Sequence, residues 1–525
     1  MMMPSNRLTR LLLAAALLVP AAARAQDRGA FVIVSAGRDT ILIERFVRTA
    51  DSVSAMAELT GRARMAITLR TTAEAAVTAA ELRAWPAGAP ADAPAPQTGS
   101  IVFAGDSVAA TLKAGAMEPR VVTVRNARGA LPLINPSAVL MEQMLMRARA
   151  LSPRDSVSMP VVVVGTTQSF PARVRWIGAD SAVLSLGPVD VRARVDAAGR
   201  MLGAVVPAQS LTIVRVAEAR SVAVAPPDYT APAGAPYTAT DVWIPHPGGF
   251  RLAGTLTLPK ERSGRVPAVV TITGSGQQDR DEAIPTVAGY RIFRQVADTL
   301  GRRGIAVLRF DDRAFGRSGG SAMEATSRDF ASDVAAVVAY LRTRPEIDPD
   351  RIALVGHSEG GIIAPMVAVD DPKVRAVVLI AGTSRNGQRI LDYQVHRGVD
   401  SDPGIPVEKR DSAYRAAWES LGTSPWITFF TGYDPLPTAA RIRQPVLILQ
   451  GATDRQVTAD QAPELEAAIR GGGNRDVTMR VFPDLNHLMV HDPSGDPAGY
   501  SRLPSGQVSP EVLGTLADWL AARLR

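Results

Sequence analysis

The sequence predicts two structural parts: a β-rich N-terminal half, then an α/β half with a mostly parallel sheet and helices on both of its faces. Three observations lead to this prediction. Up to about residue 225, short β-branched runs are separated by turn sequences. A Pro- and Ala-rich stretch without periodicity follows at 226–240. From residue 241 onward, apolar runs of strand length alternate with amphipathic stretches of helix length, which is typical of βαβ units.

Residues 1–25 have the pattern of a secretory signal peptide. Two arginines precede a short apolar run, Leu11 to Val19, and small residues stand where cleavage before Gln26 requires them. The apolar run is too short to cross about 30 Å of hydrocarbon, so we expect export rather than anchoring. The sequence therefore predicts a secreted or periplasmic mature protein without a membrane anchor.

Charge and cysteine content narrow the classes of function. The net charge is +7, but the signal segment holds three arginines and no acid, which leaves +4 over the remaining chain. No long basic run occurs, so we expect no nucleic-acid partner. The chain has no Cys, which excludes disulfides and thiolate metal sites. A chain of 525 residues is too long to form a single hydrophobic core, which agrees with two domains.

Residues 26–225 are expected to form an antiparallel meander or half-barrel. Alternation in Ala172–Trp176 predicts a strand with one wet face, and Pro86–Gly99 reads as a loop. The segment Asn135–Leu151 is the clearest predicted helix in this half. Its apolar residues share one stripe, which indicates core packing rather than a cofactor site. They are Leu140, Met141, Met144, Leu145, Ala148 and Leu151. This half contains no His, so we expect no catalytic cluster here.

The half from 241 to 525 begins with a predicted hairpin whose turn is Pro247–Gly249. Strand runs follow at 268–274, 304–311, 351–357, 376–382, 445–451 and 478–484. Helical stretches are predicted at 291–303 and 329–344, and a last helix begins at Pro510 after the N-cap Ser509. A long helix-like insertion at about 383–444 predicts a cap over the sheet.

Two segments share the pattern Gly-x-Ser-x-Gly, one around Ser358 and one around Ser318. A nucleophilic Ser on a sharp strand-to-helix turn needs a buried strand before it and a helix after it. Around Ser358 the apolar strand run 351–357 leads in and an apolar helical stretch follows. Around Ser318 polar residues separate strand and turn, and no apolar helix follows directly. We therefore interpret Ser358, with Gly356 and Gly360, as a nucleophile elbow and Ser318 as a turn residue.

A nucleophilic Ser requires a base and an acid that orients the base. Of the five His residues, His487 follows the last strand run, where a loop reaches the carboxyl edge of the sheet. His491 is the alternative. Asp454, in the loop after the strand run 445–451, lies between nucleophile and base in the chain. The order Ser358, Asp454, His487 matches the order used in this architecture.

With these residues in view, the segment 241–525 resembles the α/β-hydrolase family, and within it bacterial carboxylesterases and serine aminopeptidase-like hydrolases. The resemblance rests on "GHSEGG", "GATDRQV", "DLNH", "RFDDRAFGRSGG" and "TGSGQQDRDE", each of which follows a strand run. It implies a Ser–His–Asp triad and no cofactor. Two-domain esterases with a β-rich N-terminal module have a similar layout.

Acyl transfer also requires backbone N–H groups that stabilise the negative charge on the carbonyl oxygen. One such group is predicted at Glu359, directly after the nucleophile, and the other at Ser275 or Gly276 in the loop 273–282. A phosphate-binding loop is the rival interpretation, but no Lys follows the glycines. The charged residues 279–282 are expected to form ion pairs, and no metal site is predicted.

The cap insertion is rich in aromatic residues. Such side chains usually pack the core of the cap itself, but this many in one segment predict that at least one lines an acyl pocket. The candidates are Trp426, Phe429, Phe430 and Tyr433.

The sequence thus predicts an exported serine hydrolase that cleaves small carboxylic esters through an acyl-enzyme intermediate, with the oligomeric state left open. The first alternative is a serine aminopeptidase or acyl-peptidase with the same triad. It would bind the charged N-terminus of a short peptide through the acids of 279–282 or through Glu359. The second alternative, from another class, is a binding protein on an inactive hydrolase scaffold.

Overall fold

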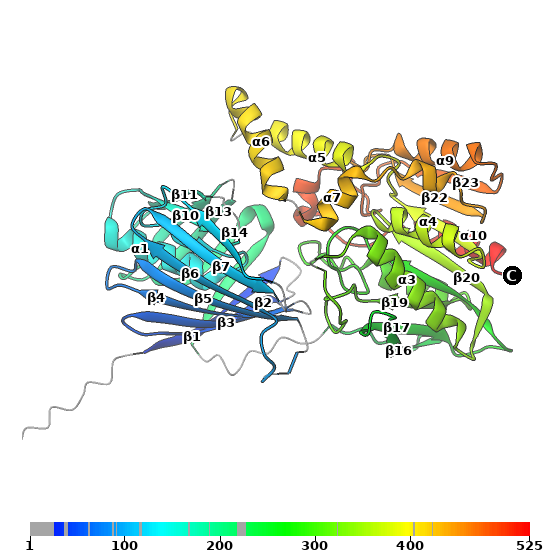
Figure 1. Cartoon of the computed structure of the whole chain (residues 1–525), viewed down its shortest axis with the longest axis horizontal. Helices are drawn as coiled ribbons and strands as arrows, with labels where there is room; N and C mark the ends of the chain where they lie inside the picture. The colour runs from blue at the N-terminus through cyan, green and yellow to red at the C-terminus, as the bar shows by residue number, and fades with distance from the viewer. Residues whose placement is uncertain are drawn as a thin grey trace, which may run out of the picture.

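The computed structural model describes residues 26–525 with short gaps. The gaps are 36–39, 61–62, 87–88, 91, 115–117, 166–168, 188, 218–226, 323, 403–404 and 423. The predicted signal peptide, residues 1–25, lies outside the described residues. Two parts lie side by side in Figure 1, a strand-rich N-terminal part and an α/β C-terminal part. Within the described part of the chain, no helix is long and apolar enough to cross a membrane.

The N-terminal part is one 15-stranded sheet with the order β8-β7-β6-β5-β4-β3-β2-β1-β15-β14-β13-β12-β11-β10-β9. Its strands are β1 (Asp27–Ser35), β2 (Thr40–Arg48), β3 (Ser52–Leu59), β4 (Ala63–Thr71), β5 (Val77–Pro86), β6 (Gln97–Ala104), β7 (Ser107–Ala114), β8 (Arg120–Val124), β9 (Leu131–Leu133), β10 (Val157–Val163), β11 (Ser169–Trp176), β12 (Ser181–Leu186), β13 (Val189–Val195), β14 (Met201–Val206) and β15 (Leu211–Val216). Only β9 and β10 pair in parallel. The predicted antiparallel meander is confirmed.

Alternating residues give this sheet one buried and one wet face. In β11, Ala172 and Val174 are buried while Arg173 and Arg175 are exposed, as the sequence predicts. The predicted loop 86–99 is shorter than expected, because β6 already begins at Gln97.

Helix α1 (Ala138–Leu151) packs on the inner face of this sheet. It contacts β2 and also β9, β10 and β11, which stand far apart in the strand order, so the sheet curls around the helix. The predicted apolar stripe is buried as far as Ala148. Leu151 is the exception: it is 49% exposed because the helix ends there.

Buried polar groups anchor α1 to the strands. Ser137, the N-cap of the helix, donates a hydrogen bond to Glu44 (2.7 Å), and the backbone N–H of Val139 donates another (2.9 Å). Arg48 donates to Glu142 of the helix at 2.6 Å. Burial raises the pKa of Glu44 to about 7, although these hydrogen bonds favour its charged form.

The C-terminal part has an eight-stranded sheet with the order β16-β17-β19-β18-β20-β21-β22-β23. Its strands are β16 (Tyr237–Pro245), β17 (Arg251–Pro259), β18 (Val266–Ile272), β19 (Ala306–Phe310), β20 (Ile347–His357), β21 (Ala376–Ile380), β22 (Val446–Gly451) and β23 (Val477–Phe482). The hairpin β16–β17 and the β17–β19 pair are antiparallel, and the remaining pairs are parallel. The sheet begins at Tyr237, four residues before the predicted start at 241.

Helices cover both faces of this sheet. They are α2 (Ile292–Gly301), α3 (Ser327–Arg342), α4 (Gly360–Asp370), α9 (Gln461–Gly471) and α10 (Pro510–Arg523). Along β18, Ala268 and Val270 pack in the core with α3, α4 and α9, whereas Val269 packs on the other side with α2 and α10. A strand buried on both faces explains the continuous apolar run in the sequence.

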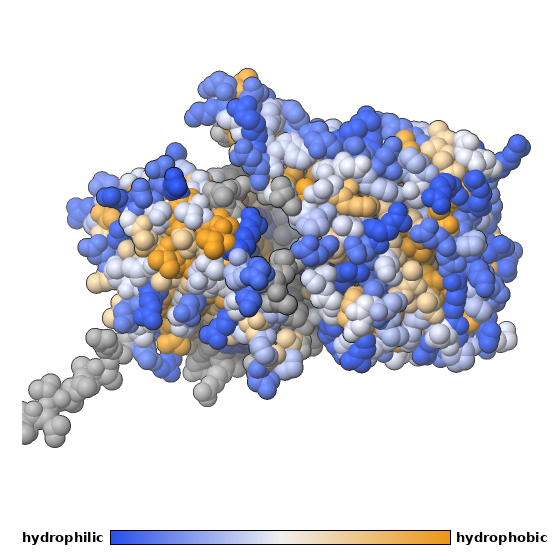
Figure 2. All heavy atoms as spheres, in the orientation of Figure 1, coloured by the Kyte–Doolittle hydropathy of each residue, from blue (hydrophilic) through white to orange (hydrophobic). Residues whose placement is uncertain are grey.

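Four further helices lie between β21 and β22. They are α5 (Gly387–Ser401), α6 (Arg410–Leu421), α7 (Pro425–Gly432) and α8 (Leu436–Ala439). Three short 3-10 helices complete the described elements: η1 (Pro207–Gln209), η3 (Val407–Lys409) and η4 (Pro497–Arg502). Figure 1 shows α5, α6 and α7 together above the sheet, in agreement with the predicted helical cap. On the face shown in Figure 2, hydrophilic residues predominate and apolar ones form small groups between them.

Candidate active site

Ser358 stands on a sharp turn between β20 and α4. Its φ is 55°, in the left-handed region that a non-Gly residue rarely adopts. A Cβ on Gly356 would lie 2.1 Å from the Gly360 carbonyl oxygen, and a Cβ on Gly360 would lie 2.3 Å from that of Ile272. Both glycines are therefore required by the close approach of the backbone, which is the geometry expected of a nucleophile elbow.

Ser318 lies in a different environment. Its hydroxyl donates to the carbonyl oxygen of Asp311 (2.7 Å) and accepts a bond from the backbone N–H of Ala253 (2.9 Å). The side chain is buried and ties the turn after β19 to β17. With both bonds engaged in this turn, the Ser318 hydroxyl is poorly placed to act as a nucleophile.

The loops after β22 and β23 bring Asp454 and His487 together. Asp454 Oδ2 lies 2.8 Å from His487 Nδ1, and Asp454 Oδ1 accepts backbone N–H bonds from Gln456 (2.8 Å) and Val457 (2.9 Å). Both side chains are buried. Because the carboxylate accepts, Nδ1 carries a proton, and Nε2 of the neutral ring is left as the proton acceptor. His487 and Ser358 line the same cavity.

His491, the predicted alternative for the base, lies elsewhere, as do His246 and His396. His491 is exposed and forms no contact with Asp454. His246 pairs with Asp333 at 3.1 Å, and the ring of His396 packs on Tyr414 in the cap. The position of His487 beside Asp454 therefore favours it over these residues as the base.

His357, the residue before Ser358, is a part of the site that the sequence analysis missed. It is buried, it lines the same cavity, and its ring centre lies 5.0 Å from that of His487. His357 Nδ1 lies 2.5 Å from Glu282, and its Nε2 donates to the His487 carbonyl oxygen at 2.9 Å. Burial opposes the charged ring, but the Glu282 carboxylate outweighs burial and raises the pKa of His357.

The loop 273–282, which follows β18, passes directly beside the nucleophile. A Cβ on Gly274 would lie 3.1 Å from the Ser358 Cβ. Asp312 holds the first half of the loop: it accepts from the Thr273 hydroxyl (2.8 Å) and from the backbone N–H of Gln278 (2.9 Å). The "RFDDRAFGRSGG" segment, which contains Asp312, thus positions this loop.

Two of the three predicted oxyanion-hole residues, Ser275 and Glu359, line the cavity beside Ser358, together with Gly274. The third, Gly276, is not part of the cavity wall and adopts a positive φ of 88° at the turn of the loop. At this end of the loop, Gly274 and Ser275 therefore form the cavity wall.

The side chain of Glu359 has a role that the sequence analysis left open. It is buried and accepts hydrogen bonds from Ser327 (2.6 Å) and from the Trp426 indole (2.9 Å). Burial raises the pKa of Glu359. The carboxyl thus connects the elbow to α3 and to helix α7 of the cap.

The cavity around Ser358 has a volume of about 320 Å³. Among the described residues, no Lys or Arg lines it. Of the four predicted aromatic residues, Trp426 and Phe430 line the wall and stack on each other. Phe429 and Tyr433 do not: they stack on each other, with ring centres 5.2 Å apart, and pack against the core.

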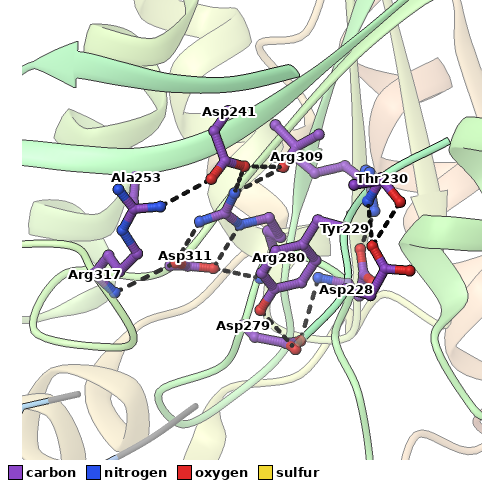
Figure 3. Close-up of polar contacts among 12 residues, drawn as sticks. Asp228, Tyr229, Thr230, Asp241, Ala253, Asp279, Arg280, Arg309, Asp311 and Arg317 are labelled. Atoms are coloured by element: carbon purple, nitrogen blue, oxygen red, sulfur yellow. Dashed lines mark hydrogen bonds and ion pairs between the residues drawn. The ribbon is translucent and has the colours of Figure 1, made fainter. Parts of the chain in front are cut away.

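Three of the four charged residues 279–282 have ion-pair partners, whereas Asp279 accepts from the Tyr229 hydroxyl and from backbone N–H groups. Arg280 is buried and pairs with Asp311 (2.8 Å) and Asp241 (3.0 Å), as Figure 3 shows. Asp281 pairs with Arg309. Glu282, by contrast, pairs with His357 inside the site. These partners come from three different strands, which is why the sequence alone does not identify them.

The sheet order, the elbow and the loops at its carboxyl edge define the C-terminal part as an α/β-hydrolase domain. In agreement with this, the model of the family "Alpha/beta hydrolase family" matches residues 285–502. The match includes Ser358, Asp454 and His487.

Two known proteins illustrate the similarity in sequence. Esterase EstD of Thermotoga maritima is 30% identical over 280 residues, which are 51% of this chain and 65% of the esterase. The uncharacterized peptidase YuxL of Bacillus subtilis is 23% identical, over 46% of this chain and 34% of the peptidase. The chain thus spans just under two thirds of the esterase and about a third of the peptidase.

A similar fold occurs in a solved structure of the Pyrococcus furiosus esterase Pf2001. It is 20% identical, covers 56% of this chain and 94% of the esterase, and gives a TM-score of 0.40.

Proposed function

We propose that this protein is an exported serine hydrolase that cleaves carboxylic esters, with Ser358 as nucleophile, His487 as general base and Asp454 as the acid that orients it. The observation that supports this most is the Asp454–His487 pair at 2.8 Å, in the cavity that also holds the strained Ser358. The 30% identity to an esterase favours the same reaction.

In the proposed reaction, Ser358 Oγ attacks the ester carbonyl while His487 Nε2 takes its proton. The imidazolium then returns this proton to the leaving alcohol, and an acyl-enzyme remains on Ser358. Water then attacks the acyl carbonyl carbon while His487 takes its proton. His487 returns this proton to Ser358 Oγ as the acid leaves. Asp454 accepts hydrogen bonds from two backbone N–H groups and from the His487 N–H, which hold the carboxyl group in place beside the base.

Backbone N–H groups of Glu359 and of the loop at Ser275 stabilise the oxyanion in this proposal. Both residues lie at the cavity wall beside Ser358. One such donor is typically worth roughly 3–4 kcal/mol in transition-state stabilisation. Asp312 keeps the first half of the loop in place by accepting bonds from Thr273 and Gln278.

The cavity favours small and uncharged acyl groups. A volume of about 320 Å³ holds roughly ten atoms of water-like size, at ~30 Å³ each. Since no Lys or Arg of the described residues lines it and the His357 ring is already bound to Glu282, a carboxylate on the substrate would find no free cationic partner. We therefore expect short-chain neutral esters to react best.

Export is proposed from the predicted signal peptide alone. If it is correct, the protein isolated from the extracytoplasmic fraction of its host begins at Gln26 by mass spectrometry. A cell-associated protein that retains residues 1–25 would contradict it.

A peptidase with the same triad is the second candidate, and it is favoured by the 23% identity to an uncharacterized peptidase. It would require a site for the charged N-terminus, and Glu359 at the cavity wall would then have to bind it in addition to Ser327 and Trp426. Rates on p-nitrophenyl acetate and on aminoacyl p-nitroanilides separate the two candidates. Faster turnover of the anilides would favour the peptidase.

The triad itself is tested with Ser358→Ala. This variant is expected to lose turnover of p-nitrophenyl acetate completely while its circular dichroism spectrum stays that of the wild type. Ser318→Ala is the matched control, because it alters the other Gly-x-Ser-x-Gly segment, and it should keep a measurable rate. Retained turnover in Ser358→Ala would refute the assignment.

A further inference from the structure

The segment that joins the two halves of the chain is fixed to the hydrolase domain before the sheet begins. Tyr229 lies against the active-site loop: its ring centre is 4.2 Å from the guanidinium carbon of Arg280, and its hydroxyl donates to Asp279 at 3.2 Å. Figure 3 shows this ring beside Arg280, with its hydroxyl directed at Asp279. The predicted linker 226–240 is therefore not a free tether at this point.

The residues on either side of Tyr229 are held as well. Arg294 of α2 donates to the carbonyl oxygens of Asp228 and Thr230, the latter at 3.0 Å. Asp228 in turn accepts from the backbone N–H of Thr230 at 2.9 Å. The backbone is thus fixed on both sides of the ring, which gives Tyr229 a defined position relative to the loop.

The groups that Tyr229 contacts shape the second half of the loop. Asp279 accepts backbone N–H bonds from Asp281 (3.2 Å) and Ala283 (2.9 Å), and its own carbonyl accepts from Glu282 (2.9 Å). Arg280 is locked by two hydrogen bonds to Asp311, of 2.9 and 2.8 Å. Tyr229 therefore packs on the two residues from which the turn at 279–283 is built.

This turn sets the position of Glu282, which reaches the reacting groups. Glu282 has a φ of 53°, a conformation that persists only where surrounding contacts hold it. Its carboxylate binds His357, and His357 donates to the backbone carbonyl of His487. A shift of the turn would move Glu282, then the ring of His357, and then the backbone that carries the proposed base.

We propose that Tyr229 is a positioning residue for the active-site loop. Through its contacts with Asp279 and Arg280, Tyr229 fixes the positions of Glu282 and His357. The inference rests on the proposed function, since it concerns the base and the oxyanion loop of that reaction. Tyr229 itself is not part of the cavity wall, so its loss leaves the substrate-binding surface intact. The effect is expected in kcat rather than in KM, because misplacement of reacting groups slows the chemical step.

The test compares variants in the full chain, with p-nitrophenyl acetate as substrate. Tyr229→Ala is expected to lower kcat about tenfold, roughly 1.4 kcal/mol in activation free energy, with KM within about twofold of wild type. Tyr229→Phe keeps the ring over Arg280 and loses only the hydroxyl, so it should restore most of the rate.

Tyr237→Phe is the matched control. Its hydroxyl also donates to an Asp, Asp298 at 2.6 Å, but this contact lies between β16 and α2, away from the loop. The two Phe variants should lose comparable stability in thermal unfolding, and Tyr237→Phe should keep the wild-type kcat. A kcat for Tyr229→Ala within about twofold of wild type would overturn the proposal. So would a loss of kcat in Tyr237→Phe as large as the loss in Tyr229→Ala.

Two further measurements keep the inference testable. If Tyr229→Ala does not fold, Tyr229→Leu gives the same comparison, since Leu fills space without a hydroxyl or an aromatic face. If the wild type does not hydrolyse the ester, the proposed function fails. In that case, the rate at which a fluorophosphonate labels Ser358 reports the arrangement of the loop in the same variants. A slower labelling rate in Tyr229→Ala alone supports the positioning role of Tyr229, and equal labelling rates refute that role.

Discussion

Replacing Asp454 with Asn tests the proposed orientation of the base. The Asp454 carboxylate accepts four hydrogen bonds: Oδ1 from the backbone of Gln456 and Val457, and Oδ2 from Gln450 (3.0 Å) and His487 (2.8 Å). If Asn keeps its oxygen on the two backbone groups, its NH2 must face two other donors. The imidazole then adopts the tautomer with the proton on Nε2, which cannot accept the proton of Ser358.

The expected loss follows from this change of tautomer. We expect kcat to fall by about 10⁴-fold, which corresponds to roughly 5 kcal/mol of transition-state stabilisation. The assay is hydrolysis of p-nitrophenyl acetate near neutral pH, with circular dichroism to establish folding. Asp492→Asn is the matched control, because Asp492 is also buried but accepts from Asn486 and Ser494 rather than from His487. A folded Asp454→Asn variant within about tenfold of the wild-type kcat would refute the reasoning.

Three further predictions concern the cavity, the loop and the N-terminal sheet. Trp426→Ala should open the cavity wall and raise the octanoate-to-acetate ratio of kcat/KM several-fold on p-nitrophenyl esters, since Trp426 stacks on Phe430 there; an unchanged ratio would contradict this. Gly274→Ala should lower kcat by about tenfold, because the new Cβ would lie 3.1 Å from that of Ser358; a wild-type rate would show that the loop yields freely. Glu44 has a folded-state pKa of about 7 against an ordinary 4.5, so the folded protein holds a proton that the unfolded chain releases between these values. The stability from this group is therefore complete below about pH 4.5 and falls as the pH rises to 7, by at most about 3 kcal/mol. Urea unfolding followed across this range should show the decline in the wild type and not in Glu44→Gln, and identical slopes would refute it.

The fold of the C-terminal half follows from local sequence patterns. The elbow can be predicted because its parts lie within about twenty residues of the chain. These parts are the strand run before Ser358, the two glycines and the apolar helix after it. The same holds for Asp454 and His487, because parallel strands place the loops after them at one edge of the sheet.

Contacts between distant segments could not be predicted in this way. His357 was not identified as part of the site, because only the folded loop shows that Glu282, 75 residues earlier, binds it. Tyr229 lies in a stretch whose composition indicates a linker, and its ring packs on Arg280, 51 positions further along the chain. The sequence predicts that at least one aromatic residue of the cap meets the cavity, but it does not indicate which of the four candidates, and Trp426 and Phe430 lie in the cavity wall.

The N-terminal half shows the same limit. Alternation predicts the strands and the helical stripe predicts α1, but nothing local indicates that the sheet curls around that helix. The pair of Arg48 with Glu142, 94 residues apart, depends on this curvature. Charged residues on a helix usually face water, so their burial here is visible only once the sheet is assembled.

The central claim is that Ser358 is the nucleophile, and the most direct measurement is to label the protein with a fluorophosphonate and map the modified residue by mass spectrometry. A single phosphonylated peptide that contains Ser358 is expected, with loss of ester hydrolysis in proportion to labelling and no label on Ser318. Labelling of another residue, or full ester turnover in a protein whose Ser358 is completely modified, would contradict the account.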